Sequence, residues 1–433
     1  MVQVGLIGLG TVGTGVAKII KSQNLRINKL VGTEVALTKF CDTIATSKPE
    51  IGLNDGILKD YKEILADKSI DIVVELIGGY EPARTIILEA IRAGKHVVTA
   101  NKAVLAKYLD EILMVAQKHE RQIYFEAAVG GGIPVIQGLN EGLAANQIKK
   151  IIGILNGTTN FILTQMVEKN ISFEQALKAA QKAGFAESDP SFDIEGTDTA
   201  HKLVILSSIA FGSWIKISDV YCEGISKLEL YDLQVAQELG YGLKLLGIAK
   251  DSAGEIEVKV HPTLLPLKHP FISVRNEYNA ISITGDAADD VMFYGKGAGM
   301  MAAASNVVAD IIYLARQVAQ GTAGKLPYII YDPKDKVSIL NHEKISSKYY
   351  LRFAMEDKPG VLAKIAGILG DSNVSIASVY QPKTIHPEKK GVPIILTTHL
   401  AEEGKVQKAL QQINQLPITK SNAIFIRIEE DGR

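Results

Sequence analysis

Residues 2–22 read "VQVGLIGLGTVGTGVAKIIKS", and they decide the fold of the N-terminal part of the chain. A mostly apolar run leads to Gly8, and an amphipathic segment begins near Val12, which predicts a strand, a glycine turn and a helix up to about Lys21. Gly8, Gly10 and Gly13 form the pattern G-x-G-x-x-G. In dinucleotide-binding folds these glycines permit the turn, the approach of the pyrophosphate and the packing of helix on strand. The context favours dinucleotide binding over a turn that serves packing alone.

Strands and helices alternate up to about residue 125. Buried strands are predicted at 34–42, 71–79 and 96–102, and a helix at 82–93 that Gly94 closes. This alternation predicts an α/β fold with a parallel, doubly wound sheet.

The pattern changes after that point. Ser172 and Gln175 have the spacing of a capping box, which predicts a helix that ends at Gly184. A separate amphipathic helix is predicted at 305–319. The region is therefore predicted to be α+β, with a strand and helix joined by an N-G-T-T-N turn at 148–169 and a mixed sheet with strands at 254–266, 280–286 and 290–299.

The last part of the chain is predicted to be a separate compact domain. Residues 325–347 have the composition of a linker. Beyond them, strands and helices follow one another in the order βαββαβ, from "YYLRFAME" to "AIFIRIEE". That order is the ferredoxin-like split βαβ arrangement.

The composition excludes several classes of protein. The chain has 433 residues, too many for one core, with 47% hydrophobic residues and a net charge of −1. The near-neutral charge argues against nucleic acid or an anionic membrane as the main partner. No apolar run is long enough to span a bilayer, and the chain opens on a strand without a secretory leader. Cys41 and Cys222 form no disulfide framework, so a reducing, cytoplasmic compartment is expected.

Polar residues at the ends of the predicted strands are candidates for ligand contacts. Asp42 ends the second strand, where an acid can bind ribose hydroxyls and repel a 2′-phosphate; a solvated turn aspartate is the equal alternative. Asn101 and Lys102 end the strand at 96–102, on the sheet edge where such folds bind ligands; a solvated residue at the start of a helix is the alternative for Lys102. Neither cysteine has a histidine nearby in sequence, which disfavours an aldehyde dehydrogenase with a thiol nucleophile.

Two loops combine carboxylates with glycines. The loop "YFEAAVGGGIPVI" (124–136) offers Glu126 and exposed carbonyls, which suit either a hard cation or a flexible domain joint. The stretch "AGFAESDPSFDIEGTDTAHK" (183–202) is rich in acids, and its Asp198 and Lys202 share one helix face. Local pattern alone leaves it open whether this stretch is a solvated loop with an ion pair or a binding site for an amine beside a lysine.

The region 180–202 resembles the signature of the homoserine dehydrogenase family throughout, in the form A-x-x-x-G-F-A-E-x-D-P-x-x-D-I-x-G-x-D-x-x-x-K. The segments "GLIGLGTVGTGV", "VVTANKAVLA", "FEAAVGGGIP", "NGTTNFIL" and "MFYGKGAG" resemble the same family in the same order. The resemblance covers about residues 1–320, and the tail is similar to an ACT domain, a small-molecule regulatory module. The chain looks like the monofunctional type, without an aspartate kinase.

The resemblance implies reversible conversion of aspartate 4-semialdehyde and NAD(P)H to L-homoserine and NAD(P)+, towards threonine and methionine. It implies that Lys202 donates and accepts the proton and that Lys102 lies beside substrate and nicotinamide. Glu187 and Asp198, with Lys102, would bind the substrate. The expected cofactor-binding residues are Gly8, Gly10, Thr11, Val12, Gly13, Asp42, Lys102, Gly184 and Gly299, and the expected ligands of a sodium-like monovalent cation are Glu126, Val129, Gly131 and Ile133.

The implied domains are a Rossmann domain (1–130), a substrate-binding, catalytic and dimerisation domain (131–320), a linker (321–347) and an ACT regulatory domain (348–430). The helix at 300–320 would close the Rossmann domain. The implied partners are the small-molecule substrate, an amino-acid effector, with threonine the first candidate, and a second copy of the chain in a homodimer or higher homo-oligomer. No nucleic acid or membrane partner is expected.

The sequence departs from the family in two places. "GKGAGMMAAAS" (295–305) has lysine where proline is common and alanines in place of the usual Pro-Thr, which bears on the backbone near Gly297 and Gly299. Asp42 replaces the basic residue that some NADP-using members have nearby, which leans the coenzyme towards NAD. The competing hypothesis is a non-catalytic NAD- and amino-acid-sensing protein, which would bind both ligands without turnover. An aspartate-semialdehyde dehydrogenase would need a cysteine and histidine in register.

Overall fold

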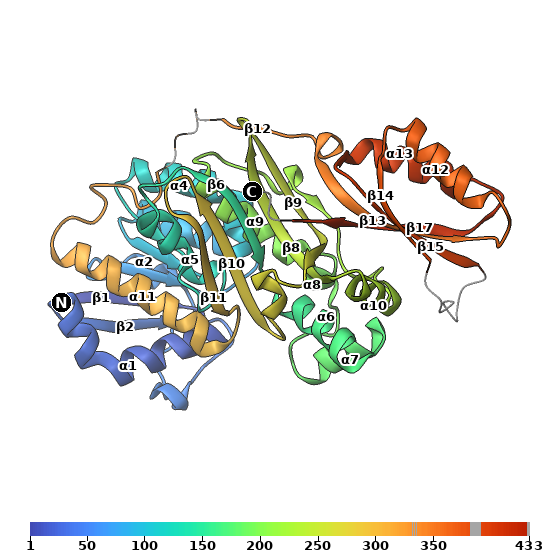
Figure 1. The fold of residues 1–433 in the computed structure, drawn as a ribbon. Helices are drawn as coiled ribbons and strands as arrows, with labels where there is room; N and C mark the ends of the chain where they lie inside the picture. Colours follow the sequence, from blue (N-terminus) through green and yellow to red (C-terminus); the bar gives the residue numbers. More distant parts are fainter. Residues whose placement is uncertain (331, 333, 335, 382–390, 431–433) are drawn as a thin grey trace. The chain divides into compact units, whose positions relative to one another are not determined.

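The computed structural model describes residues 1–330, 332, 334, 336–381 and 391–430 (Figure 1). The predicted linker and ACT domain include residues outside that description. Contacts divide the chain into two compact units. The first unit comprises Met1–Leu155, Ala200–Val220 and Tyr278–Val337, and the second comprises Asn156–Thr199, Tyr221–Glu277 and Ser338–Arg433.

The first unit contains a parallel sheet with the strand order β2-β1-β3-β4-β5. This confirms the predicted doubly wound sheet. The order reverses between β1 and β3, and such a switch point places a ligand crevice at the carboxyl ends of those strands. The elements are β1 (Val2–Ile7), α1 (Thr11–Val31), β2 (Val35–Cys41), α2 (Lys62–Leu65), β3 (Ile72–Glu75), α3 (Ala83–Arg92), β4 (His96–Thr99), α4 (Lys102–Lys118) and β5 (Ile123–Tyr124).

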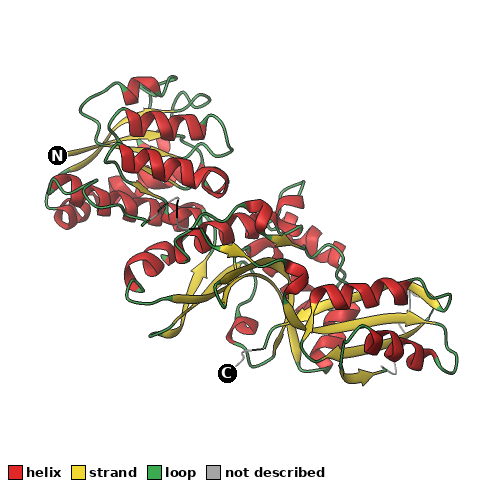
Figure 2. Ribbon diagram, turned by 90° about the horizontal axis from the view of Figure 1, so that it is seen from above, coloured by secondary structure: helices red, strands yellow, loops and turns green. Residues whose placement is uncertain are grey.

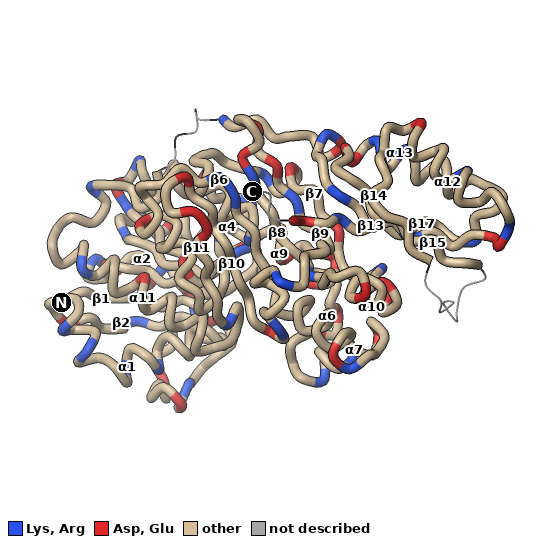
Figure 3. Tube along the Cα trace, in the orientation of Figure 1, with Lys and Arg blue, Asp and Glu red and all other residues tan. Residues whose placement is uncertain are grey.

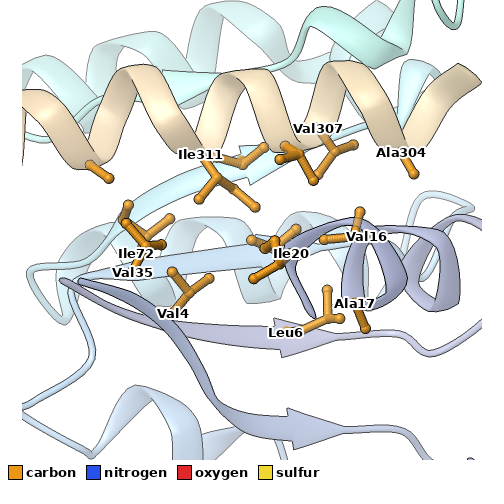
Figure 4. Close-up of a cluster of buried hydrophobic side chains, with 14 of the residues drawn as sticks. Val4, Leu6, Val16, Ala17, Ile20, Val35, Ile72, Ala304, Val307 and Ile311 are labelled. Carbon is orange, nitrogen blue, oxygen red and sulfur yellow. The ribbon is translucent and has the colours of Figure 1, made fainter. Parts of the chain in front are cut away.

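One face of this sheet is covered by α1 and by α11 (Met300–Ala319), which comes from much later in the chain. Figure 4 shows Val4 and Ile72 of the strands facing Ile20, Val307 and Ile311 of the two helices. Each such side chain contributes about 1.5–3 kcal/mol when buried. Successive strand residues point to opposite faces, and Figure 2 shows helices on both sides of these strands. The sheet is therefore covered by helices on both faces (Figure 2).

The rest of the first unit is an antiparallel arrangement of three strands. The central strand, β10 (Tyr278–Gly285), pairs with β6 (Ile148–Ile154) on one side and with β11 (Asp289–Lys296) on the other. Before β6 lies a short helix, α5 (Val135–Gln137). The predicted strands at 280–286 and 290–299 are confirmed.

The second unit begins at Asn156, which caps α6, so the predicted N-G-T-T-N turn is the N-cap and first turn of that helix. The capping box of Ser172 and Gln175 is present at the start of α7, as predicted. A long hairpin of β8 and β9 then carries the sheet of this unit. These elements are α6 (Gly157–Lys169), α7 (Phe173–Lys182), α8 (Ser191–Ile194), β7 (Tyr221–Cys222), α10 (Leu230–Glu238), β8 (Tyr241–Ser252) and β9 (Glu255–Pro266).

The C-terminal part of the second unit is the ferredoxin-like arrangement. Its strands have the order β17-β13-β15-β14, and α12 and α13 lie on the same side of the sheet in Figure 1. This confirms the predicted βαββαβ fold. The elements are β12 (Ser338–Ile339), β13 (Ser346–Met355), α12 (Val361–Asp371), β14 (Ile376–Tyr380), β15 (Val392–Thr398), β16 (Ala401–Glu402), α13 (Glu403–Asn414) and β17 (Thr419–Ile428).

A buried ion pair joins this C-terminal sheet to α10. Arg352 of β13 donates through Nε and Nη2 to the two carboxylate oxygens of Asp232, at 2.6 and 2.9 Å. Tyr350 donates to the same carboxylate at 3.0 Å, and Glu229 accepts a further bond from Arg352. Arg352 is 3% exposed and Asp232 is fully buried. The pair therefore makes the C-terminal fold part of the second unit.

One sequence-based boundary is wrong, and one strand was missed. Helix α1 continues past Lys21 to Val31, with a break at Gln23, because the later turns still bury Ile27 and Val31. Helix α11 (Met300–Ala319) matches the predicted closing helix at 300–320 and begins five residues before the amphipathic segment at 305–319. Strand β8 was not predicted, because both of its faces are buried and its apolar residues show no alternation.

Lysines, arginines and acids are mixed along the trace in each unit, as Figure 3 shows. Among the residues that the structure describes, every helix is too short or too polar to cross a bilayer.

Candidate functional site

The glycine turn after β1 has the form that the sequence predicts. Gly8 has φ +97°, and a Cβ there would lie 2.7 Å from the Leu76 carbonyl group. A Cβ on Gly13 would lie 2.0 Å from the Gly8 oxygen, so helix and turn pack too closely for a side chain. Gly10 differs, because it is exposed, has φ −68° and would place a Cβ in open space. The protein itself therefore requires Gly8 and Gly13, whereas no neighbouring atom of the described residues requires a glycine at position 10.

Gly10→Ala is expected to fold normally and to bind the dinucleotide about ten- to a hundredfold more weakly. The added methyl meets no protein atom, but it would occupy the space of a pyrophosphate bound at this turn, and such overpacking costs about 1–3 kcal/mol. Fluorescence titration gives the Kd and thermal unfolding gives the stability. The matched control is Gly13→Ala, which should lower the melting temperature. Unchanged dinucleotide affinity in Gly10→Ala would show that the pyrophosphate does not lie here.

Asp42 is tied to the glycine turn. Its carboxylate accepts hydrogen bonds from the amides of Leu9 at 2.7 Å and of Ile44 and Ala45 at 2.8 Å. Burial opposes ionisation, but these amides outweigh it and hold the pKa of Asp42 below its ordinary value. The predicted acid therefore lies beside the turn as a carboxylate.

The carboxyl ends of β3 and β4 carry a polar cluster. Glu75, which is fully buried, accepts hydrogen bonds from the Thr99 hydroxyl and the Ile77 amide, both at 2.7 Å. Asn101 caps α4 by accepting from the Val104 amide, and it donates to the Gly79 carbonyl at 2.8 Å. Burial outweighs these bonds and raises the pKa of Glu75. The cluster fixes the loop after β3 next to the start of α4.

Lys102 is the first residue of α4 and is half-buried. The sequence identified Asn101 and Lys102 correctly as residues at this sheet edge but missed Glu75. An acid at the end of an otherwise apolar strand, "DIVVELIGG", was the available signal.

In the first unit, Lys202 lies on α9 (Thr197–Ala210) and is 8% exposed. Its ammonium donates to the Leu155 carbonyl at 2.6 Å, at the end of β6. The Leu155 carbonyl oxygen only accepts, so it positions the Lys202 ammonium without taking its proton.

In the second unit, Asp198 of the same helix is 1% exposed. Asn156 donates through Nδ2 to Asp198 at 2.8 Å and to Asp193 at 2.7 Å, and it caps α6 by accepting from the Thr159 amide. The sequence found Asp198 but gave no role to Asn156 or Asp193, although both lie in matched motifs. Asn156 holds two carboxylates in a fixed arrangement.

The loop after α7 carries the other predicted acid. Gly184 has φ +76° and its amide bonds to the Gln181 carbonyl, so it ends α7 in the left-handed conformation that favours glycine. The Gln181 side chain donates to the Glu187 carbonyl at 3.1 Å, and the Glu187 side chain is exposed. The loop leaves the Glu187 carboxylate available to a ligand from solvent.

The glycine loop at 124–136 surrounds two buried carboxyl groups. Glu126 is 3% exposed and accepts from the Ile136 and Gln137 amides at 2.7 Å, and its own amide donates to Asp310. Burial raises the pKa of both carboxyl groups, that of Glu126 to about 7. Among the described residues, no cluster of three His, Cys, Asp or Glu side chains could hold a metal.

The carbonyls of this loop retain acceptor capacity. Gly131 O accepts one bond from Asn306 and Ile133 O accepts one from Val135, and each oxygen has a second lone pair. One carboxylate with the carbonyls of Val129, Gly131 and Ile133 is an all-oxygen set, which fits a hard monovalent cation.

The departure at 295–305 leaves the glycines necessary. A Cβ on Gly297 would lie 2.1 Å from the Asn279 side chain, and Gly299 has φ +116° directly before α11. Lys296 ends β11 without disturbing either position.

The Cys41 thiol is a poor nucleophile, because its burial and the nearby acids raise its pKa to about 11.

Three family models match the chain. The models described as "Homoserine dehydrogenase, NAD binding domain" and "Homoserine dehydrogenase" match residues 8–126 and 134–312, and the ACT domain model matches 349–418. A homoserine dehydrogenase of Neisseria gonorrhoeae is 43% identical over 99% of this chain and 98% of its own length. One of Pseudomonas aeruginosa is 41% identical over 99% of each chain.

Solved structures agree with these matches. The crystal structure of a homoserine dehydrogenase from Thiobacillus denitrificans is similar with a TM-score of 0.94 and 42% identity, covering 100% of this chain and 99% of that one. The Staphylococcus aureus homoserine dehydrogenase at pH 7.5 has a TM-score of 0.78 and 31% identity, covering 99% of this chain and 98% of that one.

Proposed function

The chain belongs to the homoserine dehydrogenase family, and from that premise we propose which of its residues carry the reaction. Its activity is the NAD(P)-dependent interconversion of L-aspartate 4-semialdehyde and L-homoserine, a step towards threonine and methionine. A non-catalytic sensing protein is not favoured, because both the coenzyme-binding and the catalytic family models match.

Lys202 is the proposed proton donor and acceptor. Nicotinamide, when bound, takes up or delivers the hydride. Reduction of the aldehyde leaves negative charge on the substrate oxygen, which a positioned acid must neutralise. The observation that carries this assignment is the buried Lys202 ammonium, held by the Leu155 carbonyl. Lys102 is proposed to orient the substrate oxygen and the nicotinamide.

Glu187 and Asp198 are the proposed partners of the substrate ammonium group. An amino-acid substrate carries a positive charge that carboxylates recognise by charge-assisted hydrogen bonds. Asn156 fixes the Asp198 carboxylate from one side, and the loop after α7 leaves Glu187 accessible. The two acids differ in burial. The buried Asp198 suits orientation of the bound substrate ammonium, and the exposed Glu187 suits its capture from solvent.

The coenzyme is proposed to lie along the glycine turn. The open space beside Gly10 and the free first turn of α1 at Thr11 and Val12 suit a pyrophosphate. Asp42, at the same turn, would bind ribose hydroxyls and repel a 2′-phosphate, which favours NAD. Lys102, Gly184 and Gly299 complete the proposed set.

The test of the function is an absorbance assay of reduced nicotinamide, with L-homoserine and either NAD or NADP. We expect turnover with homoserine and a higher kcat/KM with NAD. Binding of NAD and homoserine without turnover would favour the sensing protein instead. Turnover with a strong preference for NADP would support the enzymatic function but would show that Asp42 does not contact the coenzyme ribose.

A sodium-like cation is proposed at Glu126 and the carbonyls of Val129, Gly131 and Ile133. Among the described residues, backbone amides and no basic side chain donate to the two buried carboxyl groups, and such a pair suits a compensating cation. Sodium is expected to raise the melting temperature above that in choline chloride of equal ionic strength. Glu126→Gln should abolish the difference, while Glu141→Gln, a nearby exposed control, should keep it. An equal melting temperature in both salts would count against the site.

The ACT domain is proposed to bind an amino-acid effector, with threonine the first candidate. The "DKPG" turn leads into α12, whose first backbone amides suit a carboxylate. A homodimer and a cytoplasmic location stay predictions from the family resemblance and from the two free cysteines.

A further inference from the structure

A cavity in the second unit lies away from all of the residues assigned above. It has a volume of about 190 Å³ and is lined by α6, α10, β8 and the turn Pro270–Ser273. Leu163, Leu233 and Leu243 are its buried apolar walls, and the half-exposed Leu267 marks its opening. Apolar cavities of about 150 Å³ bind benzene-sized molecules, so this one has room for about six to eight non-hydrogen atoms.

Of the charged residues that line this cavity, Lys244 on β8 is the buried one, at 6% exposure. Its ammonium donates to the Asn160 side-chain oxygen at 2.8 Å and to the Val274 carbonyl at 2.5 Å. An ammonium has three donors, and both of these partners are neutral oxygens. Within the described residues no carboxylate bonds to Lys244, so the buried positive charge is not compensated by an ion pair.

The other charges near Lys244 do not neutralise it. Arg275 lies at the cavity opening with its side chain 64% exposed, and it pairs with Glu168 of α6 at 3.0 Å. Burial and the positive charge of Arg275 lower the pKa of Lys244 to about 8, against a smaller effect of Glu168. Lys244 is therefore still protonated at neutral pH, in an environment that favours an added negative charge.

We propose that this cavity binds a small aliphatic carboxylate, with its chain against the apolar walls and its carboxylate on the Lys244 ammonium. The apolar walls favour an aliphatic chain over a highly hydrated inorganic anion, and the buried cation disfavours a neutral or cationic ligand of the same shape. The site needs neither the coenzyme nor the substrate.

The test compares 4-methylpentanoate with 4-methylpentanamide, which has the same number of non-hydrogen atoms and no charge. Calorimetry on the full chain at pH 7 should give a Kd of about 1 mM for the carboxylate and binding at least about tenfold weaker for the amide. At pH 9, above the pKa of Lys244, the advantage of the carboxylate should fall, because the cation is lost. Equal affinity for the two compounds at pH 7 would overturn the proposal.

Two variants separate the cavity from other places where a carboxylate could bind. Lys244→Met should abolish the preference for the carboxylate, while Lys250→Met on the same strand, outside the cavity, should keep it. Val167→Trp fills the opening from α6 and leaves Lys244 in place, so it should block binding of both compounds. This second variant tests the site independently if Lys244→Met does not fold. Wild-type binding in Val167→Trp would place the ligand elsewhere and overturn the proposal.

Discussion

Lys202→Met is expected to lower kcat for homoserine oxidation by about two to four orders of magnitude, the span of lost general acid–base catalysis. Methionine has a similar bulk but cannot take up the proton that the substrate hydroxyl loses. Wild-type kcat should rise with pH as the acceptor becomes neutral, and the variant should lose that dependence. Steady-state absorbance assays from pH 6 to pH 10, with a separate titration of coenzyme binding, measure both effects.

The matched control is Lys408→Met, on an exposed face of α13, which should leave kcat and the pH profile unchanged. Coenzyme binding should persist in Lys202→Met, because the glycine turn is untouched. Near-normal kcat with an unchanged pH profile in Lys202→Met would refute the assignment. Lys102 would then be the better candidate for the proton carrier.

Arg352→Met is expected to lower the free energy of unfolding by about 3–5 kcal/mol, because it leaves a buried carboxylate without its cation. On β13, Asp232 now accepts hydrogen bonds from Arg352 and Tyr350. In the variant, the Tyr350 hydroxyl would be the remaining partner from that strand. Urea unfolding followed by circular dichroism measures the loss. Lys348→Met, whose Glu430 pair is a third exposed, is the control and should cost less than about 1 kcal/mol.

The double variant Arg352→Met with Asp232→Leu should recover most of the lost stability, since it removes the unpaired charge. A double variant as unstable as the single one would show that packing, not charge, sets the loss of stability.

The Arg352–Asp232 pair also determines how a truncation of the C-terminal domain must be designed, because the cut removes Arg352 and leaves Asp232 unpaired. A chain cut near Ser346 should carry Asp232→Leu, and it is expected to keep activity and lose inhibition by threonine.

The sequence by itself determined the features that depend on neighbours in the chain. The spacing of Gly8 and Gly13 specifies the turn, because a Cβ on Gly13 would clash with the Gly8 oxygen five residues earlier in the chain. Ser172 and Gln175 form their capping box within one helical turn. The signature at 180–202 likewise placed Asp198 and Lys202 on one helix, and the alternation of elements gave both the parallel sheet and the βαββαβ order.

Only the tertiary structure decided which polar groups lie opposite one another. Asp42 bonds to Leu9 across 33 residues, Glu75 to Thr99 across 24, and Asp232 to Arg352 across 120. The period of hydrophobic residues shows which face of a helix or strand is buried. It does not show which side chains from other elements pack against that face. The free energy of a buried charge depends almost entirely on that partner, and for this reason neither the Arg352 pair nor the Lys244 cavity could be predicted from the pattern of residues around it.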